Sequence, residues 1–233
     1  MAIEYPFDLL SGFRGWSTEF QLLWRQEQSR TSNGRTLVKD FGSPLWTTTY
    51  QSRSLSANEL DYWRARLDLM ENGLQTFYGR SLSRCYPIDD PRGDKISGGE
   101  GADLVFLLDF VNDYAVLNDP DEDGFSIGAI SPDRKTVVLD GPFPTGYRLG
   151  TGDMIQFGPR NLHRIMQAEA IVPGEATTRI EVRPHLWPET QTGDATSFIK
   201  PHCIMSVVPG SISSAADAST GRGVITFQAI EAR

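Results

Sequence analysis

The stretch LSANELDYWRARLDLMENG, from Leu55 to Gly73, decides the fold, because it is the one convincing helix in a sequence that otherwise reads as strands and turns. Ser56 is a good N-cap, and Glu59 follows three residues later, which is the spacing of a capping box. Leu55 before the cap and Leu60 in the first turn have the spacing of the accompanying hydrophobic staple. The stretch therefore begins with a complete helix start signal.

The predicted helix covers residues 56–72, and Asn72-Gly73 supplies its end, since glycine reaches the left-handed conformation without steric cost. Apolar residues recur at helical spacing and form one stripe, made of Leu60, Trp63, Leu67, Met70 and Leu74. A lone amphipathic helix must bury such a stripe, and sheets are the only other predicted elements against which it can pack. We expect one helix packed across a sheet.

The rest of the chain predicts a mainly β (α+β) fold. Turn-forming residues separate short runs rich in aromatic and β-branched side chains. The expected strands cover residues 20–28, 35–39, 45–53, a stretch from 74 to near 86, 104–110, 126–130, 136–139, 154–157, 162–168, 177–183, 201–208 and 223–230. Ser32-Asn33-Gly34 is a hairpin-like turn, and residues 211–221 are expected to form a long mobile loop.

Residues 89–101 are dense in turn formers and mark a boundary between two units. We expect a β-sandwich-like N-terminal domain over residues 1–95 and a second, small β-sandwich or barrel over residues 96–200. The strands in residues 201–233 are expected to return to the N-terminal sheet, because a terminal strand with one apolar face needs a sheet partner.

The net charge of −8 lies in one segment, since residues 89–123 hold eleven acidic and two basic side chains. This segment is either a solvated surface or a functional acidic patch, and the balance argues against a dedicated nucleic-acid binder. No apolar run approaches the ~20 residues of a membrane span, and no secretory signal is expected. Two cysteines, Cys85 and Cys203, favour a reducing site of synthesis.

Residues 119–124 resemble the opening of a calcium loop, with carboxylates at Asp119, Asp121 and Asp123 before Gly124. Position twelve would be Ile130 instead of a bidentate Glu, which excludes a full EF-hand. The segment is therefore either a partial Ca²⁺ site or an ordinary turn between strands.

No other cluster with catalytic or ligand spacing emerges. His163, His185 and His202 lack a partner at zinc-site spacing, and His202 and Cys203 are adjacent residues of a strand, which face opposite ways. We therefore expect no enzymatic activity, no catalytic residues and no cofactor.

Several arginines of the first unit have aromatic neighbours in the sequence, namely Arg14, Arg25, Arg30, Arg35 and Arg53. They form either an interaction surface or the solvated face of half-buried strands.

Four short segments, residues 42–46, 55–63, 71–73 and 77–80, resemble the N-terminal part of distal tail proteins of long-tailed (siphovirus-type) bacteriophages and prophages. Residues 141–155 and 162–165 resemble the second domain of that family, and the final strand followed by Glu231 resembles its ending. The resemblance covers most of the chain and consists of structural signatures.

The resemblance implies a structural virion protein that forms a hexameric ring between the tail tube and the hub or baseplate at the distal end of the tail. It would be made in the bacterial cytoplasm, would let DNA pass through the lumen without specific binding, and would contact no membrane. The alternatives are a carbohydrate-binding, receptor-recognising tail component and, third, a cell-wall hydrolase. The glycan-binding hypothesis predicts exposed aromatic residues on the second domain.

Overall fold

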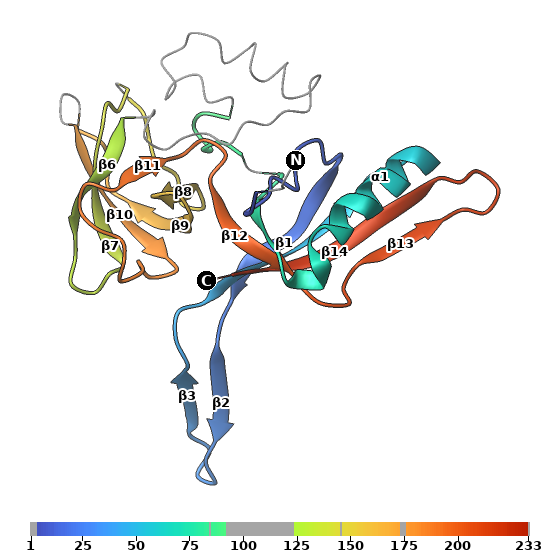
Figure 1. The fold of residues 1–233 in the computed structure, drawn as a ribbon. Helices are drawn as coiled ribbons and strands as arrows, with labels where there is room; N and C mark the ends of the chain where they lie inside the picture. Colours follow the sequence, from blue (N-terminus) through green and yellow to red (C-terminus); the bar gives the residue numbers. More distant parts are fainter. Residues whose placement is uncertain (1–3, 84, 92–123, 145, 173–175, 233) are drawn as a thin grey trace.

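The computed structural model describes residues 4–83, 85–91, 124–144, 146–172 and 176–232. The fold is mainly β, with one α-helix and one short 3₁₀ helix among the described residues. An open sheet carries the helix, and a closed barrel of short strands stands beside it (Figure 1). The expected strand at residues 104–110 lies outside the described residues, as does the part of the acidic segment from residue 92 to residue 123.

The open sheet combines strands from both ends of the chain. Its antiparallel order is β1 (Gly15–Leu23), β4 (Leu45–Ser52), β14 (Gly223–Glu231), β12 (His202–Val207) and β5 (Thr76–Arg80), and β13 (Ser213–Ala216) also pairs with β14. The C-terminal β14 therefore occupies the middle of the sheet and pairs with β4 over Thr226–Ile230. The strands that complete the open sheet, β12 and β14, therefore follow the barrel strands in the sequence.

Helix α1 (Ala57–Asp68) begins with a complete capping box. The Ser56 hydroxyl accepts a hydrogen bond from the Glu59 amide at 3.4 Å, and the Glu59 carboxylate accepts one from the Ser56 amide at 2.8 Å. These bonds satisfy two amides that the first turn would otherwise leave unpaired. The helix therefore begins directly after Ser56, as the capping box in the sequence predicts.

The α1 stripe is buried against the sheet at Leu60, Trp63, Leu67 and Met70, each at most 5% exposed. Leu74, the fifth residue of the expected stripe, is 80% exposed. The helix ends before it, and the 3₁₀ helix η1 (Glu71–Gly73) with Gly73 at φ +98° turns the chain so that Leu74 leaves the stripe. The prediction that Leu74 belongs to the buried stripe was therefore wrong. Helical spacing places residues on one face only while the backbone keeps helical dihedrals, and these end before Leu74.

The core of the first unit lies between α1 and one face of the sheet. Tyr50, Phe77 and Phe227 make edge and tilted ring contacts at centroid distances of 5.1–6.3 Å. Phe13 completes the cluster and contacts Trp63 edge to face at 5.1 Å. This cluster joins the N-terminal segment, the helix and the central strands in one core.

The second unit is a closed antiparallel barrel. Its strand order is β10 (Thr177–Arg183), β7 (Thr136–Asp140), β6 (Phe125–Ile130), β11 (Ala195–Ser197), β8 (Met154–Phe157) and β9 (Asn161–Ala168). Alternate residues point inward and form a separate core that includes Phe125, Phe157 and Phe198. Closure leaves the barrel without a free sheet edge.

Four segments differ from their sequence-based prediction. The strand expected over residues 20–28 is two strands, because the chain breaks at Trp24-Arg25 between β1 and β2 (Gln26–Arg30). The loop expected over residues 211–221 contains β13, so the turn is shorter. The strand expected to reach near residue 86 ends at Arg80, and β11 was not predicted, since its three residues carry too little pattern.

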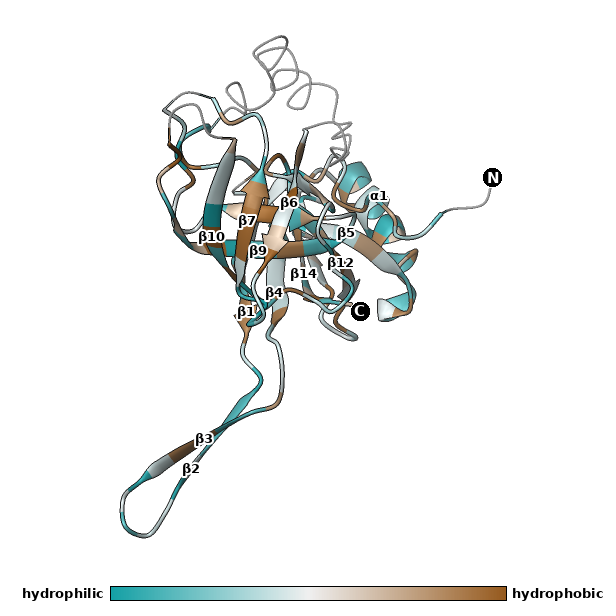
Figure 2. Ribbon diagram, turned by 90° about the vertical axis from the view of Figure 1, so that its left-hand side faces the viewer, coloured by the Kyte–Doolittle hydropathy of each residue, from teal (hydrophilic) through white to brown (hydrophobic). Residues whose placement is uncertain are grey.

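Among the described residues, strands β2 and β3 (Thr36–Asp40) pair only with each other, and they project from the end of β1 and β4 (Figure 1). We call residues 25–41 the arm. Figure 2 shows it extending away from the body of the molecule, largely hydrophilic or neutral in colour apart from a hydrophobic part of β3. The turn predicted at Ser32-Asn33-Gly34 forms its tip.

Candidate functional site

The sheet and the barrel are joined at a polar junction around Trp46. The Trp46 indole Nε1 donates a hydrogen bond of 2.7 Å to the main-chain oxygen of Leu162 in β9. The Arg164 guanidinium lies 5.1 Å from the centre of the Trp46 ring and donates to the Phe20 carbonyl at 3.0 Å. Glu231 accepts a 3.0 Å hydrogen bond from the Trp46 amide. The junction is thus a specific contact between strands from both units.

A second link of the junction runs through His202. Its amide donates to Gln156 Oε1 at 2.9 Å, its Nδ1 lies 3.3 Å from the Lys200 carbonyl, and its Nε2 lies 3.4 Å from Gln156 Nε2. A carbonyl can only accept, so Nδ1 carries the proton and Nε2 accepts from the Gln156 amide. Burial lowers the pKa of His202 to about 4, and the Arg80 charge adds to this effect. His202 is therefore held as a neutral ring.

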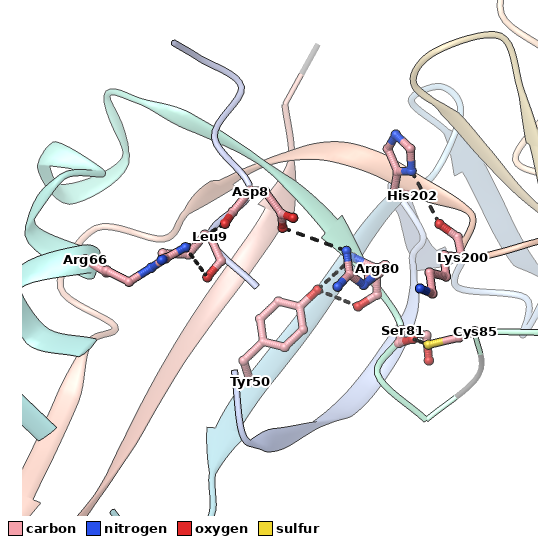
Figure 3. A network of polar contacts seen from close by, with 9 residues as sticks. All are labelled: Asp8, Leu9, Tyr50, Arg66, Arg80, Ser81, Cys85, Lys200 and His202. Carbon is pink, nitrogen blue, oxygen red and sulfur yellow. Dashed lines mark hydrogen bonds and ion pairs between the residues drawn. The ribbon is translucent and has the colours of Figure 1, made fainter. Parts of the chain in front are cut away.

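A buried polar cluster fixes the N-terminal segment (Figure 3). The Arg80 side chain is 5% exposed and lies 3.8 Å from the Asp8 carboxylate. Arg66 of α1 donates to the main-chain oxygens of Asp8 and Leu9 at 2.7 and 3.3 Å. The Tyr50 hydroxyl donates to the Arg80 carbonyl at 2.8 Å. The cluster connects three elements that the sequence separates widely.

The electrostatics of this cluster are those of a structural contact. Burial raises the pKa of Asp8, and the Arg80 and Arg66 charges oppose that rise. The segment is further held by main-chain hydrogen bonds between Phe7 and β5, namely Phe7 N–H to the Thr76 oxygen at 3.0 Å and Tyr78 N–H to the Phe7 oxygen at 3.1 Å. The arrangement clamps residues 5–9 along the edge of the sheet.

The residues considered for metal or nucleophilic chemistry lie in different elements. His163 is buried in β9 with Nδ1 2.9 Å from the Pro184 oxygen, and His185 follows β10, where burial lowers its pKa. Cys85 Sγ lies 3.5 Å from the Ser81 oxygen, and Cys203 is buried in β12. In the described parts of the chain, no three His, Cys, Asp or Glu side chains gather where they could hold a metal ion.

The calcium-loop candidates Asp119, Asp121 and Asp123 lie outside the described residues, so the structure assigns them no geometry.

The central part of the outer face of the open sheet, opposite α1, carries uncharged side chains. Its centre consists of three cross-strand pairs between β4 and β14: Gln51–Thr226, Thr49–Gln228 and Thr47–Ile230. Gln228 is exposed and the other five are half-buried. We call these six residues the uncharged face. It continues without charge into Trp16, which pairs with Gln51, and Ser206, which pairs with Ile230.

The uncharged face shares one property with interface centres, the lack of charged side chains. Solvated faces of antiparallel sheets carry polar residues, and charged residues make up 22% of this chain. The centre of a protein–protein interface is instead depleted of charge. The sequence indicates the β4 half of the uncharged face, because Thr47, Thr49 and Gln51 alternate with residues that are buried. Sequence alone does not show that β14 lies next to β4.

The arm is a second candidate contact surface, since its strands pair with no other strand among the described residues. Every residue of β2 and β3 is exposed, including Leu37 at 56% and Val38 at 60%. At its base, Leu23, Trp24 and Phe41 are each 46–50% exposed. An isolated two-stranded hairpin is marginally stable in water. The arm therefore has the properties of a contact element.

The five arginines singled out from the sequence are all exposed. Arg25, Arg30 and Arg35 belong to the arm, whereas Arg53 lies between β4 and α1 and Arg14 precedes β1. Arg14 reaches Glu59 of the capping box at 3.4 Å. The structure thus places three of the five together on one projecting element.

Neither a scan against protein-family models nor a search of curated proteins finds a match for this chain. Among the described residues, no helix combines the length and the apolar character that a bilayer span requires.

Proposed function

We propose that this chain is a structural protein of a phage tail tip, which assembles as a hexameric ring between the tail tube and the baseplate or hub. The proposal starts from the resemblance of residues 42–80 and 141–165 to distal tail proteins. In this proposal the open sheet forms the ring wall, and the barrel projects outward as a second domain.

The observation that carries the proposal is a pair of surfaces on the first unit whose residues are exposed or half-buried in the described part of the chain. The arm is exposed over its full length, and the uncharged face shows the charge depletion of an interface centre. A ring of identical subunits needs two different patches on each copy, because its contacts are heterologous and must close. The arm and the uncharged face are two such patches.

DNA passage through the ring is compatible with the charge of the chain. Proteins that hold DNA do so with lysine and arginine contacts to phosphates. This chain has a formal net charge of −8, and the uncharged face adds no cation. A neutral or acidic lumen lets DNA slide through.

The glycan-binding alternative receives no support from the barrel. That hypothesis predicts exposed aromatic residues there, yet among the described barrel residues the large apolar side chain that stands exposed is Val172. Tyr147, Phe157 and Phe198 are all buried.

The test is the stoichiometry and symmetry of the assembly. The purified chain is followed by native mass spectrometry and by class-averaged electron microscopy over rising concentration, with and without tail tube protein. We expect closed rings of six copies, bound to one end of the tube. Rings of three copies, or labelling of the capsid or side fibres in the parent particle, would refute the proposal.

A further inference from the structure

The N-terminal residues 5–9, which we call the strap, cover the edge of β5, the last strand of the open sheet. A single parallel bridge, Phe7–Phe77, joins them to β5. Its two hydrogen bonds run from the Phe7 amide to the Thr76 oxygen and from the Tyr78 amide to the Phe7 oxygen. Strand addition of this kind relies on main-chain hydrogen bonds, so a strap from the same chain and a strap from another copy fit equally well.

The surface under the strap requires a cover. Leu9 is fully buried in the core of the first unit, and Phe7 packs against that core with its ring 4.8 Å from the Arg66 guanidinium. The Tyr5 hydroxyl donates a hydrogen bond of 3.1 Å to the Leu69 oxygen at the end of α1. Without the strap, this apolar surface would be exposed to water. Every stable form of the protein therefore has a strap in this place.

The polar contact of the strap is incomplete (Figure 3). The Asp8 carboxylate and the Arg80 guanidinium lie 3.8 Å apart, which is too long for a hydrogen bond. Three buried atoms around this contact, Asp8 Oδ1, Arg80 Nη1 and Arg66 Nε, make no hydrogen bond within the described part of the chain. Buried polar atoms normally have a partner, and leaving one without a hydrogen bond costs free energy. The apolar side chains thus hold the strap in spite of this polar contact.

The charge of Asp8 also weakens the docked strap. Burial is the largest influence on this carboxyl and raises its pKa. Four groups act in the opposite direction without cancelling the rise: the charges of Arg80, Arg66 and Lys200, and the Ser11 amide, which donates a hydrogen bond. The ionised carboxylate is therefore less favourable in the docked strap than in water.

A turn that ends at Gly12 connects the strap to β1, whose first residue, Gly15, pairs with Ser52 of β4. Gly12 has φ +75°, a conformation that glycine enters and leaves without steric cost. Changes of the backbone dihedrals at this turn would move the strap as one piece while β1 stays in the sheet. Exchange of an identical element between copies keeps every contact of that element and is a low-cost route to assembly.

We propose that copies of this chain exchange straps when they assemble, so that the strap of one copy docks on β5 and the Arg66–Arg80 pair of its neighbour. Each copy gives one strap and receives one, which is a heterologous contact that can run around a closed ring. This inference rests on the proposed function for the number of copies, whereas the exchange itself can be tested separately.

The first test locates the strap by photocrosslinking. Tyr5 is replaced with the photoreactive analogue p-benzoylphenylalanine, which keeps an aromatic ring at a 37% exposed position beside the end of α1. Chains with this probe are mixed with wild-type chains that carry heavy isotopes, allowed to assemble, irradiated and digested. Mass spectrometry of the crosslinked α1 peptide then shows whether the strap lies on its own chain or on another. The control is the same mixture below the concentration of assembly.

The second test follows the release of the strap in the isolated chain by amide hydrogen exchange. The Tyr78 amide reports on release directly, because it donates to the Phe7 oxygen of the strap. Asp8→Asn removes the charge and keeps the shape, so we expect slower exchange at Tyr78. Asp61→Asn is the matched control, since the Asp61 side chain is 74% exposed on α1, and it should leave this exchange unchanged. Equal exchange in both variants would overturn the proposal, because Asp8 would then not weaken the strap.

We expect crosslinks between light and heavy chains in the assembled fraction, and only crosslinks within one chain in the control. An assembled fraction with crosslinks only within one chain would overturn the proposal. If that fraction consists of sixfold rings, the proposed function stands without strap exchange. Crosslinks between light and heavy chains in a closed dimer or a three-copy ring keep the exchange and refute the proposed function. A chain that stays monomeric at every concentration, with and without tail tube protein, refutes both.

Discussion

Trp46 in the open sheet donates its indole N–H to the carbonyl of Leu162 in the barrel, 2.7 Å away and fully buried. The same indole packs under the Arg164 guanidinium, and Leu162 belongs to the apolar cluster of the sheet. The two units therefore share core residues as well as a hydrogen bond. Units coupled in this way are expected to unfold together.

Replacing Trp46 with Phe tests this coupling. The variant keeps an aromatic ring but leaves the Leu162 carbonyl buried and unpaired, which costs about 1–3 kcal/mol, and the lost ring volume adds to that. We expect a lower free energy of unfolding in denaturant titrations and a thermal transition that begins to split in calorimetry. Trp16→Phe is the matched control, since Trp16 is 44% exposed. Equal effects from both variants would contradict the role of the hydrogen bond.

Replacing Trp63 with Ala tests how the helix is held. Trp63 is 5% exposed and contacts Phe13 edge to face, so removing it should cost about 3–5 kcal/mol. Leu74→Ala, at an 80% exposed position, should stay within about 0.5 kcal/mol of the wild type. Both values come from urea unfolding followed by circular dichroism. A Trp63→Ala variant of unchanged stability would mean that the helix does not pack on the sheet in this way.

The helix and the first sheet could be predicted because their signals are local. The Ser56–Glu59 capping box and the Leu60, Trp63 and Leu67 spacing are read within a few residues, and the structure contains each of them. Leu74 shows the limit, since only the left-handed turn at Gly73 removes it from the stripe. Local patterns thus place elements more reliably than they place the residues that follow an element's end.

The candidate surfaces could not be predicted, because they depend on contacts across long stretches of sequence. Nothing near Thr49 in the chain shows that Gln228 lies beside it. Trp24 alternates with Phe20 and Leu22, which suggested one continuous strand, yet Trp24 is 50% exposed at the base of the arm. A strand that leaves its sheet keeps the same period of two, so its pattern does not reveal the missing partner.

His202 makes the stability of the protein depend on pH. Its pKa is lowered from 6.5 to about 4 by burial, so the folded state binds fewer protons than the unfolded state between these values. The stability that the neutral ring provides is complete above pH 6.5 and is lost as the pH falls towards 4. The full shift corresponds to about 3 kcal/mol.

The measurement is the free energy of unfolding at several pH values for the wild type and His202→Gln. Acidic residues titrate at the low end of this range in both proteins, so the difference between the two curves isolates His202. We expect the wild type to lose its advantage over the variant as the pH falls from 7 to 4. Parallel curves would show that His202 titrates normally in the folded protein.

Gly73→Ala tests the end of the helix. Gly73 has φ +98°, and an added Cβ would lie 2.4 Å from the main-chain oxygen of Val207. The backbone conformation alone costs about 1–3 kcal/mol for a residue with a side chain. Gly193→Ala is the matched control, because Gly193 has φ +93° and nothing within 4 Å of the added atom. We expect Gly73→Ala to lower the melting temperature more than Gly193→Ala. Equal losses of melting temperature would mean that β12 moves away from the added Cβ at Val207 without a cost in stability.

Replacing the arm with a short turn separates folding from assembly. Every residue of β2 and β3 is exposed, and in the described part of the chain the two strands pair only with each other. Removing residues 25–41 therefore deletes no core contact, and we expect the thermal transition of the isolated chain to stay nearly unchanged. The assembled form should disappear in native mass spectrometry, because the arm is one of the two contact patches of the proposed ring. A milder variant, Leu37→Asp with Val38→Asp, should weaken assembly in the same direction. An arm-deleted chain that still forms the wild-type assembly would show that another surface holds the copies together.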